Sequence, residues 1–454
     1  MNSSGKFSED KPIGELVPLA SIPDTPLRDG KAPWKQSEPL TDFKSQCTPL
    51  IFGGGVFAYG KYNDDQLVHS DAALRALRLA FRYGMNALDT SPFYHPSEFV
   101  LGRALRILSE EYPRSSYFLI TKCGRYGFNK SDFDYSPDCI RASIERSCKR
   151  LGTEYLDAAL LHDAEFISDQ PKIAQTPQGA NLAAQAIGIT CAGEQRTQAQ
   201  AQDLLGIAPE HAAQIRGDGD QQVLDAARAL FALKDQGIIR NVGMSGYPLG
   251  ELLRLSRLIA SHPPYRPLDV ILNYSNHTLH ADLLPAFLPL FAERPYSYEP
   301  EWHPPMMLNA SAFSMGLFSD HGTPSWHPAD PKLKQAVQLA HARVKNAAQV
   351  TDVPPITGDN VLGYTALVSG LRCAFFHPPV PTLLGMSTVE EVHTAVAAYR
   401  ALTAEHQPSS LDPSLQEKSL RVYQQLSASE ALILQTLRQA QVQNLCWPSP
   451  SLDS

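Results

Sequence analysis

The chain has 454 residues, of which 43% are hydrophobic and 19% are charged, so it can bury either one large barrel or the cores of two ordinary domains. The formal net charge is −8 and the basic residues are scattered, which disfavours nucleic acid and membranes as partners. The seven cysteines form no CxxC pair and indicate neither a disulfide framework nor a metal site. Without an apolar leader or a run of about 18 apolar residues, we expect a cytoplasmic protein.

Residues 1–46 contain many Pro, Ser, Lys and Asp residues without apolar periodicity, which predicts a flexible N-terminal tail. From residue 47 onward, short apolar runs alternate with longer amphipathic segments. The runs predict strands at Leu50–Phe57, Asn86–Thr90, Tyr117–Lys122, Leu156–His162, Ile239–Ser245, Val270–Tyr274, Met306–Ala310 and Thr382–Gly385. The amphipathic segments predict helices near 72–84, 97–109, 138–151, 221–236, 248–261, 281–291, 332–349 and 389–402. Eight such units predict a single (β/α)₈ TIM barrel over residues 47–402, in the α/β class.

Two stretches interrupt this alternation. Residues 165–219 are rich in Ala and Gln and follow the fourth strand, so they belong on the face of the barrel where active sites form. They could cover the site or be an idle surface insertion, and the sequence leaves both open. Residues 293–305 form a second insertion, whose aromatic residues favour packing. Residues 403–454 predict a C-terminal extension that begins with two amphipathic helices.

The candidate catalytic residues lie at or just after the ends of three consecutive predicted strands. Asp89 ends the second strand and Tyr94 follows it, Lys122 ends the third, and His162 ends the fourth. Side chains at these strand ends converge on one mouth of a parallel barrel. A Tyr that moves a proton near neutral pH needs a cation to lower its pKa, which Lys122 would supply while Asp89 holds it charged. His162 would donate a hydrogen bond to the substrate oxygen.

Each of these four residues also has an ordinary structural interpretation. A strand-terminal Asp is commonly a cap, a single Tyr a rim aromatic, and a single His a satisfied core residue. Because four residues with compatible chemistry fall at three neighbouring strand ends, a joint catalytic role is favoured over four unrelated structural roles.

The strings DTSPFY, LITKCGRY and LLHD resemble the aldo-keto reductase superfamily, whose catalytic tetrad is Asp, Tyr, Lys and His in this order. The resemblance implies that Asp89, Tyr94, Lys122 and His162 are catalytic. Longer strings, including TKCGRYGFNKSDFDYSP and NASAFSMGLFSDHGTPSWHPADPKLK, resemble the branch of fungal D-arabinose 1-dehydrogenases and plant L-galactose dehydrogenases.

The family resemblance also implies a nicotinamide dinucleotide that lies across the barrel mouth without a Rossmann unit. The residues expected to bind it are Gly55, Ser245, Asn273, Ser311, Met315, Gly316, Gly385, Ser387 and Glu391. NADP-preferring relatives place Lys or Arg after the eighth strand, where this chain has Ser387, Glu390 and Glu391. Carboxylates repel a phosphate, so we expect NAD, with NADP possible.

The branch resemblance implies oxidation of an aldose of the D-arabinose, L-galactose or L-fucose type at C1 to its lactone. Phe57, His95 and Asp163 are candidate contacts to the sugar. One alternative is a general NADPH-dependent aldehyde and ketone reductase, and another is a cofactor-sensing regulatory subunit with little turnover. The sequence leaves the oligomeric state open.

Overall fold

The computed structural model describes residues 14–35, 39–171, 181–189, 195–295, 302–347, 356–445 and 447–449. Both predicted insertions and both predicted terminal segments therefore extend partly outside the described residues, as do the last residues of the helix predicted near 332–349.

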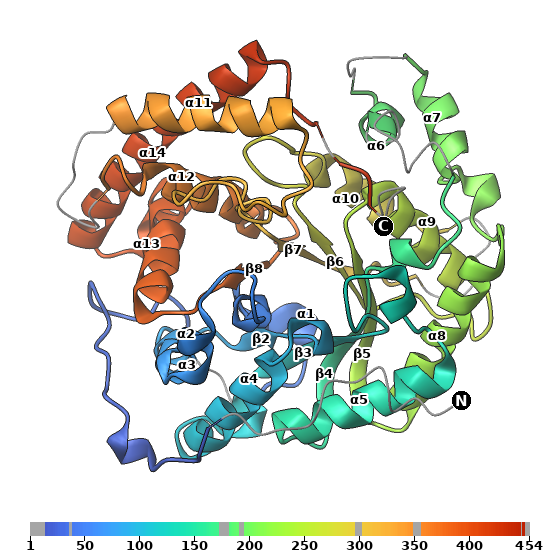
Figure 1. The fold of residues 1–454 in the computed structure, drawn as a ribbon, viewed down its shortest axis with the longest axis horizontal. Helices are drawn as coiled ribbons and strands as arrows, with labels where there is room; N and C mark the ends of the chain where they lie inside the picture. The colour runs from blue at the N-terminus through green and yellow to red at the C-terminus, as the bar shows by residue number, and fades with distance from the viewer. Residues whose placement is uncertain are drawn as a thin grey trace.

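Eight parallel strands close into a barrel in which each strand pairs with its neighbours in sequence and the first pairs with the eighth (Figure 1). The strands are β1 Leu50–Gly53, β2 Ala87–Asp89, β3 Phe118–Cys123, β4 Leu156–His162, β5 Ile239–Gly246, β6 Val270–Tyr274, β7 Met306–Ala310 and β8 Thr382–Gly385. This architecture confirms the predicted (β/α)₈ barrel.

Alternation along the strands decides which side chains enter the barrel. The interior is filled by a separate cluster of apolar side chains from successive strands, including Phe118, Ile120, Ala158 and Leu160. Continuing the same alternation by two residues places Lys122 and His162 in the top layer of the interior. At the other end, Phe43 of helix α1 (Phe43–Gln46) packs edge-on against Phe118, with ring centroids 5.1 Å apart, and closes the bottom.

Strand β1 is shorter than the sequence predicts, because a 3₁₀ turn begins at Gly54 and runs to Phe57. A Cβ on Gly54 would lie 2.6 Å from the Ser97 hydroxyl oxygen and 3.0 Å from the Asp89 carbonyl oxygen. Only glycine allows this close approach, which bends the chain across the barrel mouth.

An outer ring of helices surrounds the barrel (Figure 1). These helices are α2 Asp65–His69, α3 Ala72–Arg82, α4 Ser97–Ile107, α5 Pro137–Leu151, α8 Asp218–Asp235, α9 Leu249–Ala260, α10 Leu284–Ala292, α11 Pro331–Ala347, α12 Val361–Leu371 and α13 Val389–His406. Helix α12 was not predicted, because all of its residues are buried and its sequence has no polar face to reveal a helical period. The insertion after β4 carries two short helices, α6 Leu182–Ala186 and α7 Gln198–Leu205.

Beyond α13, one helix, α14 Pro413–Gln439, replaces the two predicted helices. The segment contains no glycine, and its only proline is at the first helical position, where it is tolerated, so nothing in the segment breaks the helix. Helix α14 lies against α11, α12 and α13.

The described part of the N-terminal segment lies on the outer helices. The Arg28 backbone N–H donates to the Tyr83 hydroxyl at 2.9 Å, and its side chain pairs with Glu390 of α13 at 2.6 Å.

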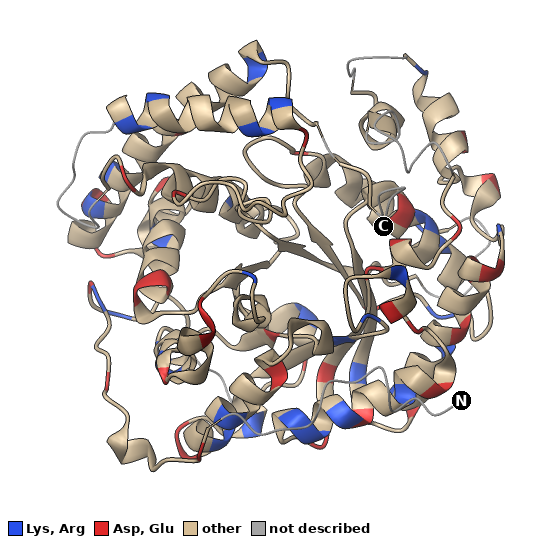
Figure 2. Ribbon diagram, viewed as in Figure 1, with Lys and Arg blue, Asp and Glu red and all other residues tan. Residues whose placement is uncertain are grey.

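Basic and acidic residues interleave around the helical ring (Figure 2). Among the described residues, no helix combines the length and apolar character needed to cross a membrane.

Candidate active site

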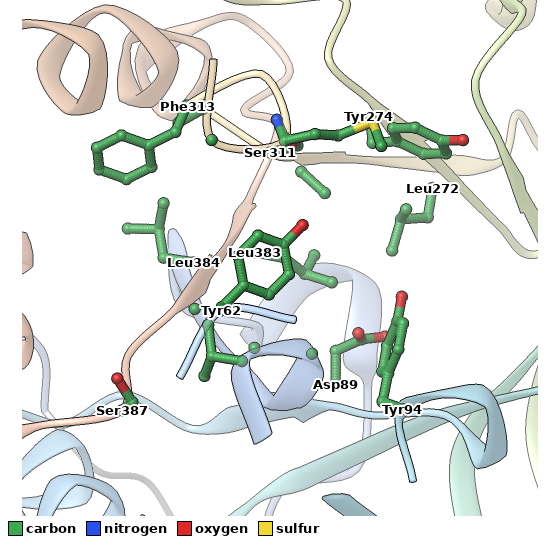
Figure 3. Close-up of a pocket in the computed structure, with 18 of the residues that line it drawn as sticks. Tyr62, Asp89, Tyr94, Leu272, Tyr274, Ser311, Phe313, Leu383, Leu384 and Ser387 are labelled. Atoms are coloured by element: carbon green, nitrogen blue, oxygen red, sulfur yellow. The ribbon is translucent and has the colours of Figure 1, made fainter. Parts of the chain in front are cut away.

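A cavity of about 650 Å³ opens at the carboxyl ends of the strands. Residues at or next to strand ends line it, among them Asp89, Lys122, His162 and Ser245. Figure 3 shows Asp89 and Tyr94 on one side of the cavity and Tyr274 and Ser311 on the other, with Tyr62 between them. The volume is in the range of small-molecule sites, and the location is where barrel enzymes place their chemistry.

The four predicted catalytic residues come together at this cavity. The Lys122 ammonium donates to both Asp89 carboxylate oxygens, at 2.7 and 2.6 Å, and to the Thr90 carbonyl oxygen at 3.1 Å. The Lys122 Nζ atom also lies 4.7 Å from the centre of the Tyr94 ring. The Tyr94 and His162 rings meet edge to face, with centroids 5.5 Å apart.

The electrostatics of Tyr94 differ from the expectation that Lys122 lowers its pKa. Burial raises the pKa of the phenol well above its ordinary value of 10.0, and the negative charges of Asp89 and Asp163 raise it further. The Lys122 ammonium is directed to the Asp89 carboxylate, which neutralises much of its field at the phenol. Tyr94 therefore keeps its proton at neutral pH in the ligand-free site.

His162 is held in a neutral form suited to hydrogen bonding. Burial lowers its pKa well below the ordinary value, and the positive charges of Lys122 and Arg125 lower it further. The Ser91 hydroxyl lies 2.9 Å from Nδ1 and accepts a hydrogen bond from the Phe93 backbone N–H. A Ser91 hydroxyl that donates to Nδ1 leaves the imidazole hydrogen on Nε2, where it can be donated to a ligand.

Three of the predicted site residues are not brought to the cavity wall. Phe57 is fully buried behind it and stacks on Phe52, with ring centroids 6.3 Å apart, because the Gly54 turn points it into the core. His95 packs against Tyr59 and Phe99. Asn273 is fully buried and donates to the Gly246 and Tyr247 carbonyl oxygens at 3.1 and 2.9 Å.

Arg125 lines the cavity, although it was not among the predicted site residues. It lies two residues past β3 and pairs with the Asp163 carboxylate. Its position in the loop after a strand is the one available signal, because barrel enzymes take ligand contacts from these loops.

The C-terminal segment also reaches the back of the site. Trp447 stacks on Tyr247, with ring centroids 4.9 Å apart, and the Ser449 hydroxyl donates to Glu165 Oε1 at 3.0 Å. Burial raises the pKa of Glu165 to about 8, and the charge of Asp163 contributes in the same direction. Glu165 also accepts from the Tyr247 backbone N–H at 3.0 Å. The segment thus buttresses the loop that carries Asp163.

Comparison with known proteins identifies the family of this chain. The Aldo/keto reductase family profile matches residues 49–284. This chain belongs to the aldo/keto reductase family. It is 29% identical to D-arabinose 1-dehydrogenase from Saccharomyces cerevisiae over 376 residues, which cover 82% of this chain and 89% of that protein. It is 29% identical to L-galactose dehydrogenase from Arabidopsis thaliana over 385 residues, which cover 84% and 88%.

A solved aldo-keto reductase from Bacillus halodurans, in its holo form, aligns over 82% of this chain and 91% of its own at 19% identity, with a TM-score of 0.47. Aldo/keto reductases are oxidoreductases that use NAD(H) or NADP(H).

The residues around the cavity of this aldo/keto reductase fit such a dinucleotide. The turn after β7 has positive φ angles at Ser311, Ser314, Met315 and Gly316, of 64°, 51°, 56° and 88°. Within the described part of the chain, the backbone N–H groups of Ala312 and Phe313 make no hydrogen bond, and both residues line the cavity. A concave turn with unused N–H groups can hold a pyrophosphate. The expected cofactor residues that line the cavity are Gly55, Ser245, Ser311, Met315, Gly316, Gly385, Ser387 and Glu391.

Proposed function

We propose that this aldo/keto reductase oxidises an aldose at C1 to its lactone. The observation that carries the proposal is the Tyr94 hydroxyl, which lines the cavity beside His162 and has no hydrogen-bond partner among the described residues. The names of the two relatives that match most of the chain supply the substrate class.

In this reaction, C1 loses a hydride and its hydroxyl loses a proton, so that a C1 carbonyl remains. The bound nicotinamide dinucleotide supplies the hydride acceptor. The unprotonated form of Tyr94, which is the minor form at neutral pH and increases with pH, takes the proton. His162 Nε2 donates a hydrogen bond to the same substrate oxygen and orients it. Asp89 holds the Lys122 ammonium next to the Tyr94 ring. The residues that would hold the dinucleotide are those of the β7 turn together with Ser245 and Ser387.

A second candidate is the reduction of aldehydes and ketones, which the raised pKa of Tyr94 favours. A phenol that keeps its proton at neutral pH is ready to donate it to a carbonyl oxygen. The two candidates use the same residues in opposite directions.

Steady-state assays separate the two candidates. We expect measurable oxidation of D-arabinose, L-galactose or L-fucose with NAD at pH 9, and a higher kcat/KM for these sugars than for simple alcohols. Rapid NADPH-dependent reduction of a broad aldehyde panel, without oxidation of any of the three sugars, would support the second candidate and overturn the first.

We also propose that NAD is preferred over NADP, on the basis of Glu391. Its Oε2 atom accepts hydrogen bonds from the Ser387 backbone N–H at 2.6 Å, the Ser387 hydroxyl at 2.7 Å and the Thr388 backbone N–H at 3.1 Å. The carboxylate thus already occupies donors at the N-terminal end of α13 that a phosphate would use. Ser387 and Glu391 both line the cavity.

Glu391→Gln should lower the preference for NAD. Glutamine keeps the cap on α13 but removes the charge that repels a phosphate, so we expect the ratio of kcat/KM for NAD to that for NADP to fall about tenfold, which is about 1.4 kcal/mol. The matched control is Glu390→Gln, which removes the adjacent carboxylate, paired with Arg28 and not part of the cavity wall. An unchanged ratio in Glu391→Gln would refute the assignment.

A further inference from the structure

Arg125 is the one cation of the cavity wall besides Lys122 among the described residues. Its guanidinium carbon lies 3.9 Å from the centre of the Phe93 ring and 5.1 Å from that of Phe166. Its Nη1 atom pairs with the Asp163 carboxylate, and its Nε atom donates to the Gly127 carbonyl oxygen at 3.2 Å. Stacking and pairing together fix the plane of the guanidinium.

The ion pair leaves polar atoms unused on both partners. Within the described part of the chain, Arg125 Nη2 has no acceptor and Asp163 Oδ1 has no donor. Both residues line the cavity, and Asp163 Oδ2 lies 3.8 Å from His162 Nε2. A fixed donor and a fixed acceptor therefore lie directly beside the catalytic His.

We propose that Arg125 and Asp163 form a hydroxyl subsite, which selects polyhydroxylated substrates by binding two neighbouring ring hydroxyls. Arg125 Nη2 donates to one hydroxyl oxygen, and Asp163 Oδ1 accepts from the other hydroxyl. The inference rests on the proposed function, because it takes an aldose as the ligand. It assigns the preference for sugars over simple carbonyl compounds to this pair.

The charge of the pair argues for a neutral polyol over an anion. Asp163 cancels the charge of Arg125, and its free oxygen would repel a carboxylate or phosphate on the ligand. A substrate without hydroxyls would displace water from both unused atoms and leave them unpaired, which is costly in a buried site. Vicinal hydroxyls satisfy both at once.

The site also aligns this pair with the reacting group. Phe93, which supports Arg125, packs against the rings of Tyr94 and His162, with centroids 5.7 and 5.6 Å away. The backbone of Asp163 adopts a left-handed conformation with φ of 53°, directly after the strand residue His162. A ring held by the subsite is thereby placed next to Tyr94 and His162.

The test is Arg125→Lys, which keeps the positive charge that Asp163 needs but loses the planar fork. We expect kcat/KM for oxidation of D-arabinose or L-galactose, whichever is the better substrate, to fall about 10- to 100-fold, as for one lost hydrogen bond to a charged group. Reduction of butanal, which has no hydroxyl, should change much less. The loss should also shrink for the 2-deoxy or the 3-deoxy analogue of the same sugar.

The matched control is Lys61→Gln, because Lys61 is a cation that lies over the Phe128 and Trp326 rings, at 4.0 and 4.8 Å. This variant should leave the ratio between sugar and butanal unchanged. Equal losses for sugar and butanal in Arg125→Lys would overturn the subsite while leaving the proposed function intact. A wild-type protein that reduces butanal but oxidises no aldose would overturn both. Thermal unfolding of each variant, compared with wild type, identifies losses that come from misfolding.

Discussion

Replacing Tyr94 by Phe is expected to lower kcat for aldose oxidation by about 10²–10⁴-fold, the usual contribution of a positioned proton acceptor. The variant removes one oxygen and keeps the ring that packs against His162, so the fold and the affinity for substrate should change little. Steady-state kinetics on the purified variant provide the measurement. The matched control is Tyr62→Phe, which removes a phenol oxygen from the same cavity and should cause a much smaller loss.

The pH profile of the wild-type protein gives an independent reading of Tyr94. Burial raises the pKa of this phenol well above 10.0. The unprotonated fraction of Tyr94 therefore keeps increasing as the pH rises through the neutral and alkaline range. The kcat/KM for oxidation should therefore rise with pH to beyond pH 10, whereas reduction should stay level over that range. The rise should disappear in Tyr94→Phe. If Tyr94→Phe oxidised the aldose with the kcat of wild type, Tyr94 would not be the proton acceptor.

The second large effect is expected from separating Lys122 and Asp89. Both are buried, and each provides the charge that compensates the other. Asp89→Leu or Lys122→Met alone leaves one charge unpaired in the barrel, and we expect the free energy of unfolding to fall by about 3–5 kcal/mol. Urea unfolding at pH 7 measures this loss.

The double variant Asp89→Leu/Lys122→Met distinguishes a charge effect from a packing effect. It removes both charges and should recover most of the stability lost in either single variant, yet remain inactive. In Lys122→Met, the loss should also shrink as the pH falls, because the pKa of Asp89 is raised by burial and protonation then removes the unpaired charge. If the loss of unfolding free energy in the double variant equalled the sum of the losses in the two single variants, the proposed coupling between Lys122 and Asp89 would be wrong.

The sequence predicts the barrel, and the meeting of the four candidate residues at its mouth, because both depend on local periodicity. Two-residue alternation along β3 and β4 places Lys122 on the same interior-facing row as Phe118, and His162 on the same row as Ala158. The same periodicity fails for Phe57, since the glycine turn at the end of β1 rotates it away from the cavity.

The features that the sequence did not reveal depend on contacts between distant segments. Arg28 reaches Glu390 across 362 positions, and Ser449 reaches Glu165 across 284. Likewise, the capping contacts of Glu391 and the pairing of Arg125 with Asp163 arise from loop conformation, which no periodic pattern encodes.

The most direct measurement uses an aldose that carries deuterium at C1, incubated with the protein and NAD, followed by mass spectrometry of the lactone and of the reduced cofactor. We expect one deuterium in the reduced nicotinamide for each lactone formed. Lactone formed with its deuterium lost to solvent, or no lactone from any of the three sugars, would contradict hydride transfer from C1 of an aldose.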